Sequence, residues 1–428
     1  MTNTPAPPRT SPLHDRHEAL GASFTDFGGW NMPVRYTSDL AEHRAVREAA
    51  GLFDISHMAE FTVEGPDAGG FLDYVLAGRL STMKIGKAKY SLVLAASGGI
   101  VDDVIVYRTG EQHFLVIANA GNRDAVAAAL ETARVAWGRS SDAASRTDTE
   151  TGEGFPGSEA PTGSAPSEAG TRAASQVPEG TGPRSFAFVA GSTGPTIEDV
   201  TDHFALIALQ GPEARGILSS TPGVEISGTA LDELGYYAWT DGTFEGAPLF
   251  VARTGYTGED GYELLIPTTH AGALWDAALA AGSEMGLVPC GLAARDTLRL
   301  EAGMPLYGHE LSRDIVPAQA GLGRVVAVDK EAFVGKDGLS SGPADAPVLV
   351  GLVSEGRRAG RAGYAVLHGD DSVGEITSGA LSPTLGYPVA MAFVAPAASE
   401  PGTELTIDVR GTRIPATVTA LPFYRRNA

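Results

Sequence analysis

The residues with the clearest chemical potential lie in Arg-Thr-Gly-Tyr-Thr-Gly-Glu-Asp-Gly-Tyr-Glu-Leu, residues 253–264. Apolar residues precede this run at 248–252 and follow it at 262–266, as two strands would. Three glycines between them permit the positive φ angles of a tight turn, so we expect a hairpin with Glu259 and Asp260 at its tip. A carboxylate held on such a turn can accept hydrogen bonds from paired N–H donors of a ligand. The alternative is a solvated acidic turn without a ligand.

Two adjacent carboxylates form a second candidate, in Gly-Gly-Ile-Val-Asp-Asp-Val-Ile-Val-Tyr, residues 98–107. Neighbouring residues of a strand point to opposite faces, so one of Asp102 and Asp103 faces the interior or a cleft. Asp103 is in register with Ile105 and Tyr107, although alternation alone does not decide which face is the core. A carboxylate among apolar groups is costly unless it is paired or functional. The alternative is that both carboxylates accept backbone N–H bonds at the end of a turn.

Basic residues that could support these carboxylates lie on a predicted helix over residues 291–302. Arg295 and Arg299 are four residues apart and therefore share one face of that helix. Asp296 can pair with Arg299, which on a surface would contribute little to stability. The other reading is that Arg295 neutralises a binding-site carboxylate such as Glu259, because a guanidinium fork matches a carboxylate.

Lysines gather near Tyr90. Lys84, Lys87 and Lys89 are three of the five lysines of a chain whose net charge is −21. Such clustering in an acidic chain is a candidate docking surface for an acidic partner, and a solvated loop is the alternative.

Composition and missing motifs exclude several functions. The net charge argues against a general nucleic-acid binder. The single cysteine, Cys290, rules out an internal disulfide and a thiolate-rich metal site, and the histidines are scattered, so we expect no metal. A Gly-x-Ser-x-Gly motif, a dinucleotide fingerprint and a Walker loop are all absent. Without a signal peptide or a run of about 20 apolar residues, we expect a soluble, cytoplasmic protein without membrane contacts.

The elements that must position these groups follow from length and periodicity. A chain of 428 residues with 43% hydrophobic content predicts two or three domains with large cores. Residues 1–12 and 139–184 contain almost no large apolar residues, which predicts a disordered tail and a disordered insertion. Residues 13–138 and 185–345 mix helices and strands. Residues 346–428 contain short strands between Gly/Pro turns, which predicts a small β-barrel or sandwich.

Periodicity and turn residues also place individual elements. Helices are predicted over residues 40–50, 67–75, 122–136, 274–285 and 291–302. Strands are predicted over residues 59–63, 91–94, 101–107, 114–118 and 204–209, and in the last third over 348–353, 364–367, 373–377, 390–394, 405–409 and 414–419.

Taken together, the motifs of this chain resemble those of the T-protein, or aminomethyltransferase, family of the glycine cleavage system. The resemblance covers nearly all of residues 13–426, in order. It rests on Phe-Gly-Gly-Trp-Asn-Met-Pro at 27–33, Gly-Leu-Phe-Asp-Ile-Ser-His-Met at 51–58, Gly-Gly-Ile-Val-Asp-Asp at 98–103, Leu-Gln-Gly-Pro at 209–212, the glycine-rich run at 253–264, Gly-Leu-Ala-Ala-Arg-Asp at 291–296, Arg-Leu-Glu-Ala-Gly-Met-Pro-Leu-Tyr-Gly at 299–308, Gly-Glu-Ile-Thr-Ser-Gly at 374–379, Ser-Pro-Thr-Leu-Gly at 382–386 and Pro-Phe-Tyr-Arg at 422–425.

The resemblance implies an α+β fold of three domains in a clover-leaf. Two are intertwined α+β domains with ferredoxin-like elements, the third is a C-terminal β-barrel, and a folate channel runs through the centre. It also implies a reaction with the lipoylated H-protein. The aminomethyl group on the dihydrolipoyl arm of that partner is transferred to tetrahydrofolate, which releases ammonia and yields 5,10-methylene-tetrahydrofolate.

The resemblance also implies site residues. Asp103 matches the catalytic aspartate of the family, and Glu259 would accept the paired N–H groups of the aminopyrimidine edge of folate. The remaining expected folate contacts are Tyr90, Asn119, Tyr236 and Arg295, with Met58 lining the channel and Tyr424 and Arg425 closing it.

Two related groups of proteins are alternatives. The folate domains of dimethylglycine- and sarcosine-oxidising enzymes usually accompany a flavin domain, for which this chain has neither a fingerprint nor spare residues. A non-enzymatic folate-binding accessory protein of iron–sulfur assembly carries Gly-Cys-Tyr-x-Gly-Gln-Glu. The corresponding run here, Gly-Tyr-Thr-Gly-Glu at 255–259, has no cysteine, which favours the transferase.

Overall fold

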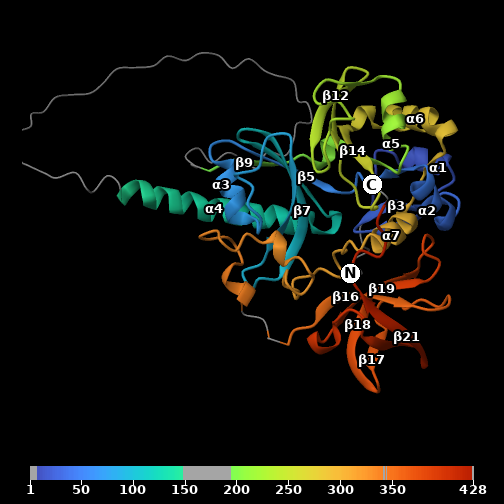
Figure 1. Ribbon diagram of the computed structural model, residues 1–428. Helices are drawn as coiled ribbons and strands as arrows, with labels where there is room; N and C mark the ends of the chain where they lie inside the picture. Colours follow the sequence, from blue (N-terminus) through green and yellow to red (C-terminus); the bar gives the residue numbers. More distant parts are fainter. Residues whose placement is uncertain (1–6, 148–193, 341–342, 344, 427–428) are drawn as a thin grey trace, which may run out of the picture.

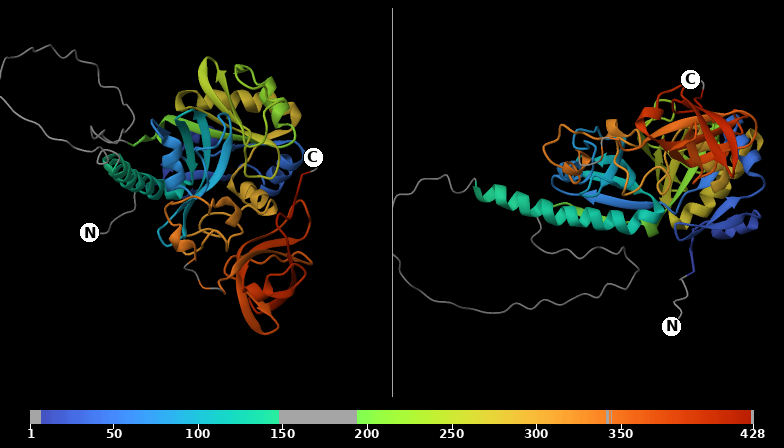
Figure 2. Two further views of the ribbon diagram at one scale, coloured as in Figure 1. Left: turned by 60° about the vertical axis from the view of Figure 1, so that its left-hand side comes forward. Right: turned by 90° about the horizontal axis from the view of Figure 1, so that it is seen from below.

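The computed structural model describes residues 7–147, 194–340, 343 and 345–426, and of residues 139–147 only the backbone. Most of the predicted tail and insertion therefore lies outside the described residues. Where they are described, two differences emerge. Strand β1 (Arg9–Thr10) lies within the predicted tail because it pairs with β3. Helix α4 (Arg123–Thr147) enters the predicted insertion, since residues 139–147 contain Ala and Arg but no proline or glycine, and it projects from the body of the molecule (Figure 2).

In the described part of the chain, strands form three sheets and one closed barrel, arranged as three lobes (Figure 1). The first lobe contains a five-stranded sheet in the order β6-β7-β8-β5-β9, with α3 and α4 packed together. These strands are β6 (Ala88–Leu94), β7 (Ile100–Gly110), β8 (His113–Ala118), β5 (Ala59–Glu64) and β9 (Thr196–Asp199).

The second lobe contains a seven-stranded sheet in the order β11-β12-β13-β14-β10-β4-β15. Its strands are β11 (Val224–Ile226), β12 (Trp239–Phe244), β13 (Ala247–Ala252), β14 (Gly261–Pro267), β10 (Phe204–Gln210), β4 (Ala50–Asp54) and β15 (Leu287–Pro289). The two lobes are intertwined, because β4 precedes the first sheet in the chain yet pairs with β10, while β9 returns to the first sheet. A small sheet, β1-β3-β2, adds β2 (Ser23–Phe27) and β3 (Trp30–Arg35).

The third lobe is a closed barrel in the order β16-β19-β18-β17-β20-β21, which decides between the predicted barrel and sandwich. Its strands are β16 (Val348–Ser354), β17 (Ala365–His368), β18 (Asp371–Leu381), β19 (Pro388–Val394), β20 (Glu404–Val409) and β21 (Thr412–Thr419). Each contains one of the six strands predicted for this region, apart from single end residues, and its apolar side chains fill the barrel interior.

The helices cover the sheets and join the lobes. They are α1 (His14–Ala19), α2 (Asp39–Glu48), α3 (Ala68–Val75), α4, α5 (Ala214–Ser220), α6 (Thr268–Gly282) and α7 (Leu292–Glu301). Short 3-10 turns are η1 (Ala120–Asn122), η2 (Thr201–His203), η3 (Ser283–Met285), η4 (Gly323–Val325), η5 (Asp337–Ser340) and η6 (Pro396–Ala398). Helix α7 contacts α2, β3 and the barrel strands β18 and β19, so it connects the second lobe to the third.

The predicted hairpin at residues 248–266 is confirmed. Strands β13 and β14 pair in antiparallel register, with Phe250 opposite Leu265, and Glu259 and Asp260 lie in the connection. Gly258 has a φ of 81° in that connection, a conformation that side-chain-bearing residues adopt at a cost. The turn brings the hairpin tip against Ala302 at the end of α7. The α+β fold with a C-terminal barrel is thus as expected from the sequence.

Candidate active site

A cavity of about 480 Å³ lies where the two α+β lobes meet, and its volume is typical of a small-molecule site. Strands β7 and β8 form one wall. The segment after β4, the hairpin β13–β14 and helix α7 form another, and the irregular stretch of residues 303–307 covers part of the space. Five of the predicted site residues line this cavity: Met58, Tyr90, Asp103, Asn119 and Arg295.

Asp103 is the carboxylate that strand β7 directs into the cavity. Tyr90 Oη donates to its Oδ2 at 3.1 Å, and Asn119 Nδ2 donates to its Oδ1 at 2.7 Å. Burial raises the pKa of Asp103, and these two hydrogen bonds partly offset that rise because they favour the ionised form. Strand pairing makes this possible, since β6 lies beside β7 and carries Tyr90 opposite Ile105. The result is an oriented acidic group with an open side toward a ligand.

Asn119 presents its carbonyl oxygen, rather than its amide group, to a ligand. Its Nδ2 donates to Asp102 Oδ1 at 2.9 Å and to Asp103 Oδ1 at 2.7 Å. Those two carboxylates use both N–H bonds of the amide, and a carbonyl oxygen turned toward them would be repelled. Asn119 therefore lines the cavity with a hydrogen-bond acceptor.

Glu263 is the second carboxylate of the cavity, and it was not predicted. Thr254 Oγ1 and Tyr107 Oη both donate to its Oε2, and its Oε1 accepts no hydrogen bond from any described residue. The charge of Glu263 acts on buried Arg295, whose guanidinium lies 4.9 Å from the ring centre of Tyr256. Burial lowers the pKa of Arg295, and Glu263 opposes that shift. Arg295 thus interacts by charge with a cavity carboxylate, and that carboxylate is Glu263.

Apolar and aromatic groups fill the remaining walls. Met58, Ile105, Ile117, Leu206, Tyr237 and Tyr256 are among them. His57 also lines the cavity, and its pKa is lowered to about 4 by burial and by the charge of Arg295, so the imidazole is neutral at pH 7. These surfaces can hold a flat ring system, and few polar groups are left to orient it.

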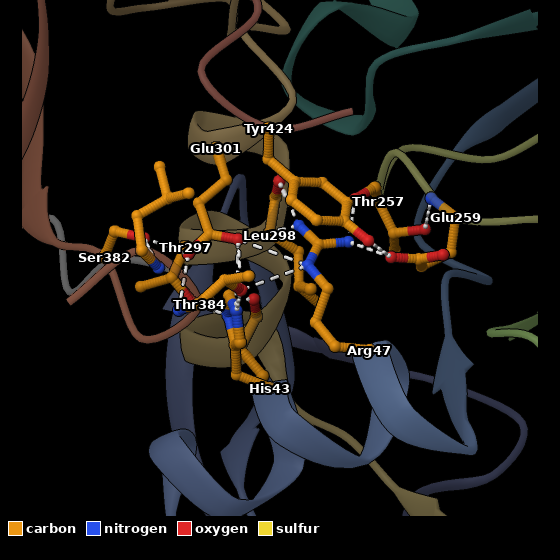
Figure 3. A network of polar contacts seen from close by, with 12 residues as sticks. His43, Arg47, Thr257, Glu259, Thr297, Leu298, Glu301, Ser382, Thr384 and Tyr424 are labelled. Atoms are coloured by element: carbon orange, nitrogen blue, oxygen red, sulfur yellow. Dashed lines mark hydrogen bonds and ion pairs between the residues drawn. The ribbon is translucent and has the colours of Figure 1, made fainter. Parts of the chain in front are cut away.

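Glu259 does not lie where the sequence led us to expect. Its carboxylate is buried away from the cavity lining, in a network between the hairpin tip, α2, α7 and the barrel (Figure 3). Arg47 Nη1 donates to Glu259 Oε1 at 2.9 Å and to Thr257 O at 2.7 Å, and Tyr424 Oη donates to the same Oε1 at 2.7 Å. These partners hold Oε1, and Glu259 does not belong to the residues that line the cavity.

The same network ties the barrel to the second lobe. Arg47 Nη2 pairs with Glu301 Oε2 at 2.8 Å, and Thr384 Oγ1 and Ser382 Oγ of the β18–β19 connection donate to Glu301. His43 Nε2 lies 3.2 Å from the same carboxylate. Figure 3 shows Arg47 between Glu259 and Glu301 with the ring of Tyr424 over its guanidinium, at 4.0 Å.

Three more predicted contacts lie outside the set of described residues that line the cavity. Tyr236 is 47% exposed, and its neighbour Tyr237 lines the cavity instead. Tyr424 bonds Glu259, and Arg425 is exposed. The expected pair of Arg299 and Asp296 forms at 2.7 Å, yet Arg299 is buried and also binds Glu310 and Ser378, so it is no surface pair.

The described residues contain no group of three or more His, Cys, Asp or Glu side chains that could hold a metal ion. None of their helices is long and apolar enough to cross a membrane.

Comparison with known proteins decides the family. The GCVT N-terminal domain matches residues 13–151 and 184–330, and the Glycine cleavage T-protein C-terminal barrel domain matches residues 348–425. The chain belongs to the glycine cleavage T-protein family. Membership in this family confirms the resemblance drawn from the motifs and makes the chain a transferase.

Individual relatives agree with this T-protein assignment over the whole chain. Aminomethyltransferase of Cutibacterium acnes is 48% identical over 426 residues, which cover 98% of this chain and 99% of the relative. Aminomethyltransferase of Streptomyces avermitilis is 46% identical and covers 98% of both chains. The crystal structure of glycine cleavage system aminomethyltransferase T from Bartonella henselae superimposes with a TM-score of 0.76 at 33% identity, covering 97% of this chain and 98% of that one.

Some residues of this T-protein site had a detectable signal in the sequence. Glu263 interrupts the otherwise apolar run at 262–266, and a carboxylate in such a strand indicates pairing or function. His57 was visible within the motif at 51–58 but carried no spacing that indicated a role. Tyr237 and residues 303–307 meet the cavity only through tertiary packing, which local patterns do not encode.

Proposed function

We propose that this chain transfers the one-carbon unit of an aminomethyl group, carried on the dihydrolipoyl arm of the lipoylated H-protein, to tetrahydrofolate bound in the cavity. Ammonia, 5,10-methylene-tetrahydrofolate and the H-protein with its dihydrolipoyl arm as a free dithiol are the products. One observation supports the proposal above the others. A single cavity holds an oriented carboxylate, Asp103, together with a second carboxylate, Glu263, and aromatic and apolar walls between them.

The residues present fit the pterin end of a folate. Glu263 Oε1 is free to accept from the aminopyrimidine N–H groups, and its Oε2 is fixed by Thr254 and Tyr107. We assign to Glu263 the role that the sequence suggested for Glu259. Tyr237, Met58 and Leu206 supply flat and apolar contact surfaces. The positive charge of Arg295 interacts with the negative charge of Glu263. Tetrahydrofolate, when bound, supplies the nitrogen nucleophile that accepts the one-carbon unit.

Asp103 is the proposed catalytic residue. Positive charge develops on the carbon and nitrogen atoms that react, and a fixed carboxylate in a water-poor cavity stabilises that charge without reorganising. Tyr90 and Asn119 hold both carboxylate oxygens, so Asp103 is oriented before a substrate arrives. Burial also raises the pKa of Asp103, which makes it a stronger base than an exposed aspartate.

A direct assay tests the proposal. Purified protein is mixed with tetrahydrofolate and with H-protein loaded with the aminomethyl group, and methylene-tetrahydrofolate and ammonia are measured. We expect both products in equal amounts, and much less with free aminomethyl-lipoamide as donor, because a protein partner adds binding energy. Absence of product with the loaded H-protein would reject the proposed function.

A further inference from the structure

Asp102, the neighbour of Asp103, is fully buried behind the cavity and accepts three hydrogen bonds. The backbone N–H of Asn119 donates to its Oδ2 at 2.9 Å. The side-chain amides of Asn119 and Asn122 donate to its Oδ1 at 2.9 and 2.6 Å. Three donors on one buried carboxylate are more than a strand needs for its own stability, since an apolar residue of similar size would leave no buried charge. Asp102 therefore calls for another explanation.

The contacts of Asn119 supply one. Its single amide group joins Asp102 to Asp103, with one N–H directed to each carboxylate. Asp102 also holds the backbone of Asn119, so it fixes that residue at two points. Any movement of Asp102 would release the amide that orients Asp103. The order of contact is Asn122, Asp102, Asn119, Asp103, and only Asp102 lies outside the cavity lining.

The two carboxyl groups also interact through charge. Burial, and then the charge of Asp103, raise the pKa of Asp102 to about 7, although the hydrogen bonds from Asn122 and Asn119 oppose the rise. Asp103 faces the cavity and accepts from Tyr90, a hydrogen bond that favours its ionised form. The other groups that face this pair are Tyr90 and Tyr307, the latter beside Arg313. Burial raises the pKa of both tyrosines above their ordinary value of 10, so neither ionises near pH 7.

We propose that Asp102 is a positioning residue for the transfer reaction, which orients Asp103 through Asn119 and strengthens the negative potential behind it when it loses its proton. The proposal rests on the proposed function of the cavity. It predicts that the rate constant of transfer rises as the pH passes through neutrality, since a second negative charge further stabilises the positive charge that develops on the reacting atoms.

The test compares kcat and KM of the wild-type protein with those of three variants, Asp102→Asn, Asn122→Ala and Asp124→Asn. The measurements run from about pH 5.5 to about pH 9, a range that spans the pKa values of histidines and of buried carboxyl groups. In Asp102→Asn we expect kcat about tenfold lower above neutrality, with no step near pH 7 and an unchanged KM for folate. In Asn122→Ala the step moves up by about one pH unit, because a hydrogen bond that favours the ionised form is lost. Asp124, exposed in the first turn of α4, is the matched carboxylate control and keeps the wild-type profile.

A second measurement does not depend on transfer. The carbon-13 shifts of the aspartate carboxyl groups are followed against pH in the substrate-free protein. In the wild type we expect one carboxyl signal to titrate at about pH 7. This titration should be absent in Asp102→Asn and should occur at a higher pH in Asn122→Ala. Because Asn122→Ala retains Asp102, it still tests the proposal if Asp102→Asn fails to fold. A Asp102→Asn variant whose rate falls equally at every pH, or a wild type without that titration, would overturn the proposal. A wild type that makes no product but shows the titration would reject the proposed function while supporting the coupling of the two aspartates.

Discussion

Two groups of buried charged side chains share the hairpin β13–β14 and helix α7, yet only one of them is joined by ion pairs between described residues. At the hairpin tip and the end of α7, Arg47 pairs with Glu259 and Glu301, and Tyr424 and the barrel add hydrogen bonds. At the start of β14, next to the hairpin connection, and in the first turn of α7, Glu263 and Arg295 face the cavity. There, Glu263 Oε1 and Arg295 Nη1 have no hydrogen-bond partner among the described residues.

The difference separates a structural role from a binding role. Buried charges that pair with charges from other elements hold those elements together, and removing one partner leaves the others buried without a counter-charge. A buried charge with an unused atom beside a cavity has that atom available to a ligand. By this criterion the Arg47 network joins the lobes, and the group around Glu263 is the proposed binding group.

The largest effect is expected from Arg47→Ala. It leaves Glu259 and Glu301 buried without their counter-charge, so we expect the free energy of unfolding to fall by about 3–5 kcal/mol. Denaturant unfolding monitored by circular dichroism measures this. Arg295→Ala is the matched control, and it should lose folate affinity with a smaller loss of stability. Equal destabilisation by the two variants would contradict the distinction between a structural and a binding group.

The pH dependence of stability is the next largest. Burial raises the pKa of Glu301, but the hydrogen bond and charge of His43, with hydrogen bonds from Ser382 and Thr384, outweigh burial and lower it to about 2. A lowered folded-state pKa means that Glu301 stabilises the protein above its unfolded pKa and loses this contribution as pH falls. We expect a loss of about 3 kcal/mol between roughly pH 5 and pH 2. Glu301→Gln should flatten that part of the unfolding curve, and an unchanged slope would contradict the assignment.

Asp103→Asn tests the cavity side by rate. The variant keeps the shape of the side chain but removes its charge, so the transfer rate should fall by about 100-fold or more. Folate affinity, measured by calorimetry, should change far less. Turnover close to that of the wild type would remove Asp103 from catalysis.

The smallest effect contrasts the two glutamates of the hairpin. Glu263→Gln should weaken folate binding about tenfold or more, because hydrogen bonds to a charged group contribute about 1.5–3 kcal/mol. Glu259→Gln should leave folate affinity unchanged while lowering the melting temperature. If calorimetry showed the reverse, Glu259 rather than Glu263 would contact folate.

Much of this fold followed from local patterns. The barrel strands, the hairpin and helix α7 lie where apolar periodicity and glycine turns predicted them, because each is amphipathic on its own. Helix α2 ends before the predicted residue 50, because Ala50 already belongs to β4. Helix α4 extended further than composition suggested, since helix propensity continues through residues 139–147.

The candidate site followed only in part. Asp103, Arg295 and Met58 belong to motifs that the chain carries intact, and they meet Tyr90 and Asn119 in one cavity. Glu259 was assigned the wrong surroundings, because its motif specifies a turn but not its partner. That partner is Arg47, 212 residues earlier, and no local pattern connects the two. The choice between the two glutamates of one hairpin therefore required tertiary structure.

The pairing of β4 also constrains how the chain can be made. All five residues of this strand are buried. Its antiparallel neighbour is β10, where Ile207 pairs with Asp54, so the pairing cannot form until β10 has been synthesised. During synthesis an apolar strand thus leaves the ribosome long before its partner, and such late, distant pairing slows folding. A fragment that ends before Phe204 would display β4 as a bare edge, which is a template for association with other chains. The two α+β lobes therefore form one folding unit, and neither is a module that could be transplanted without the other.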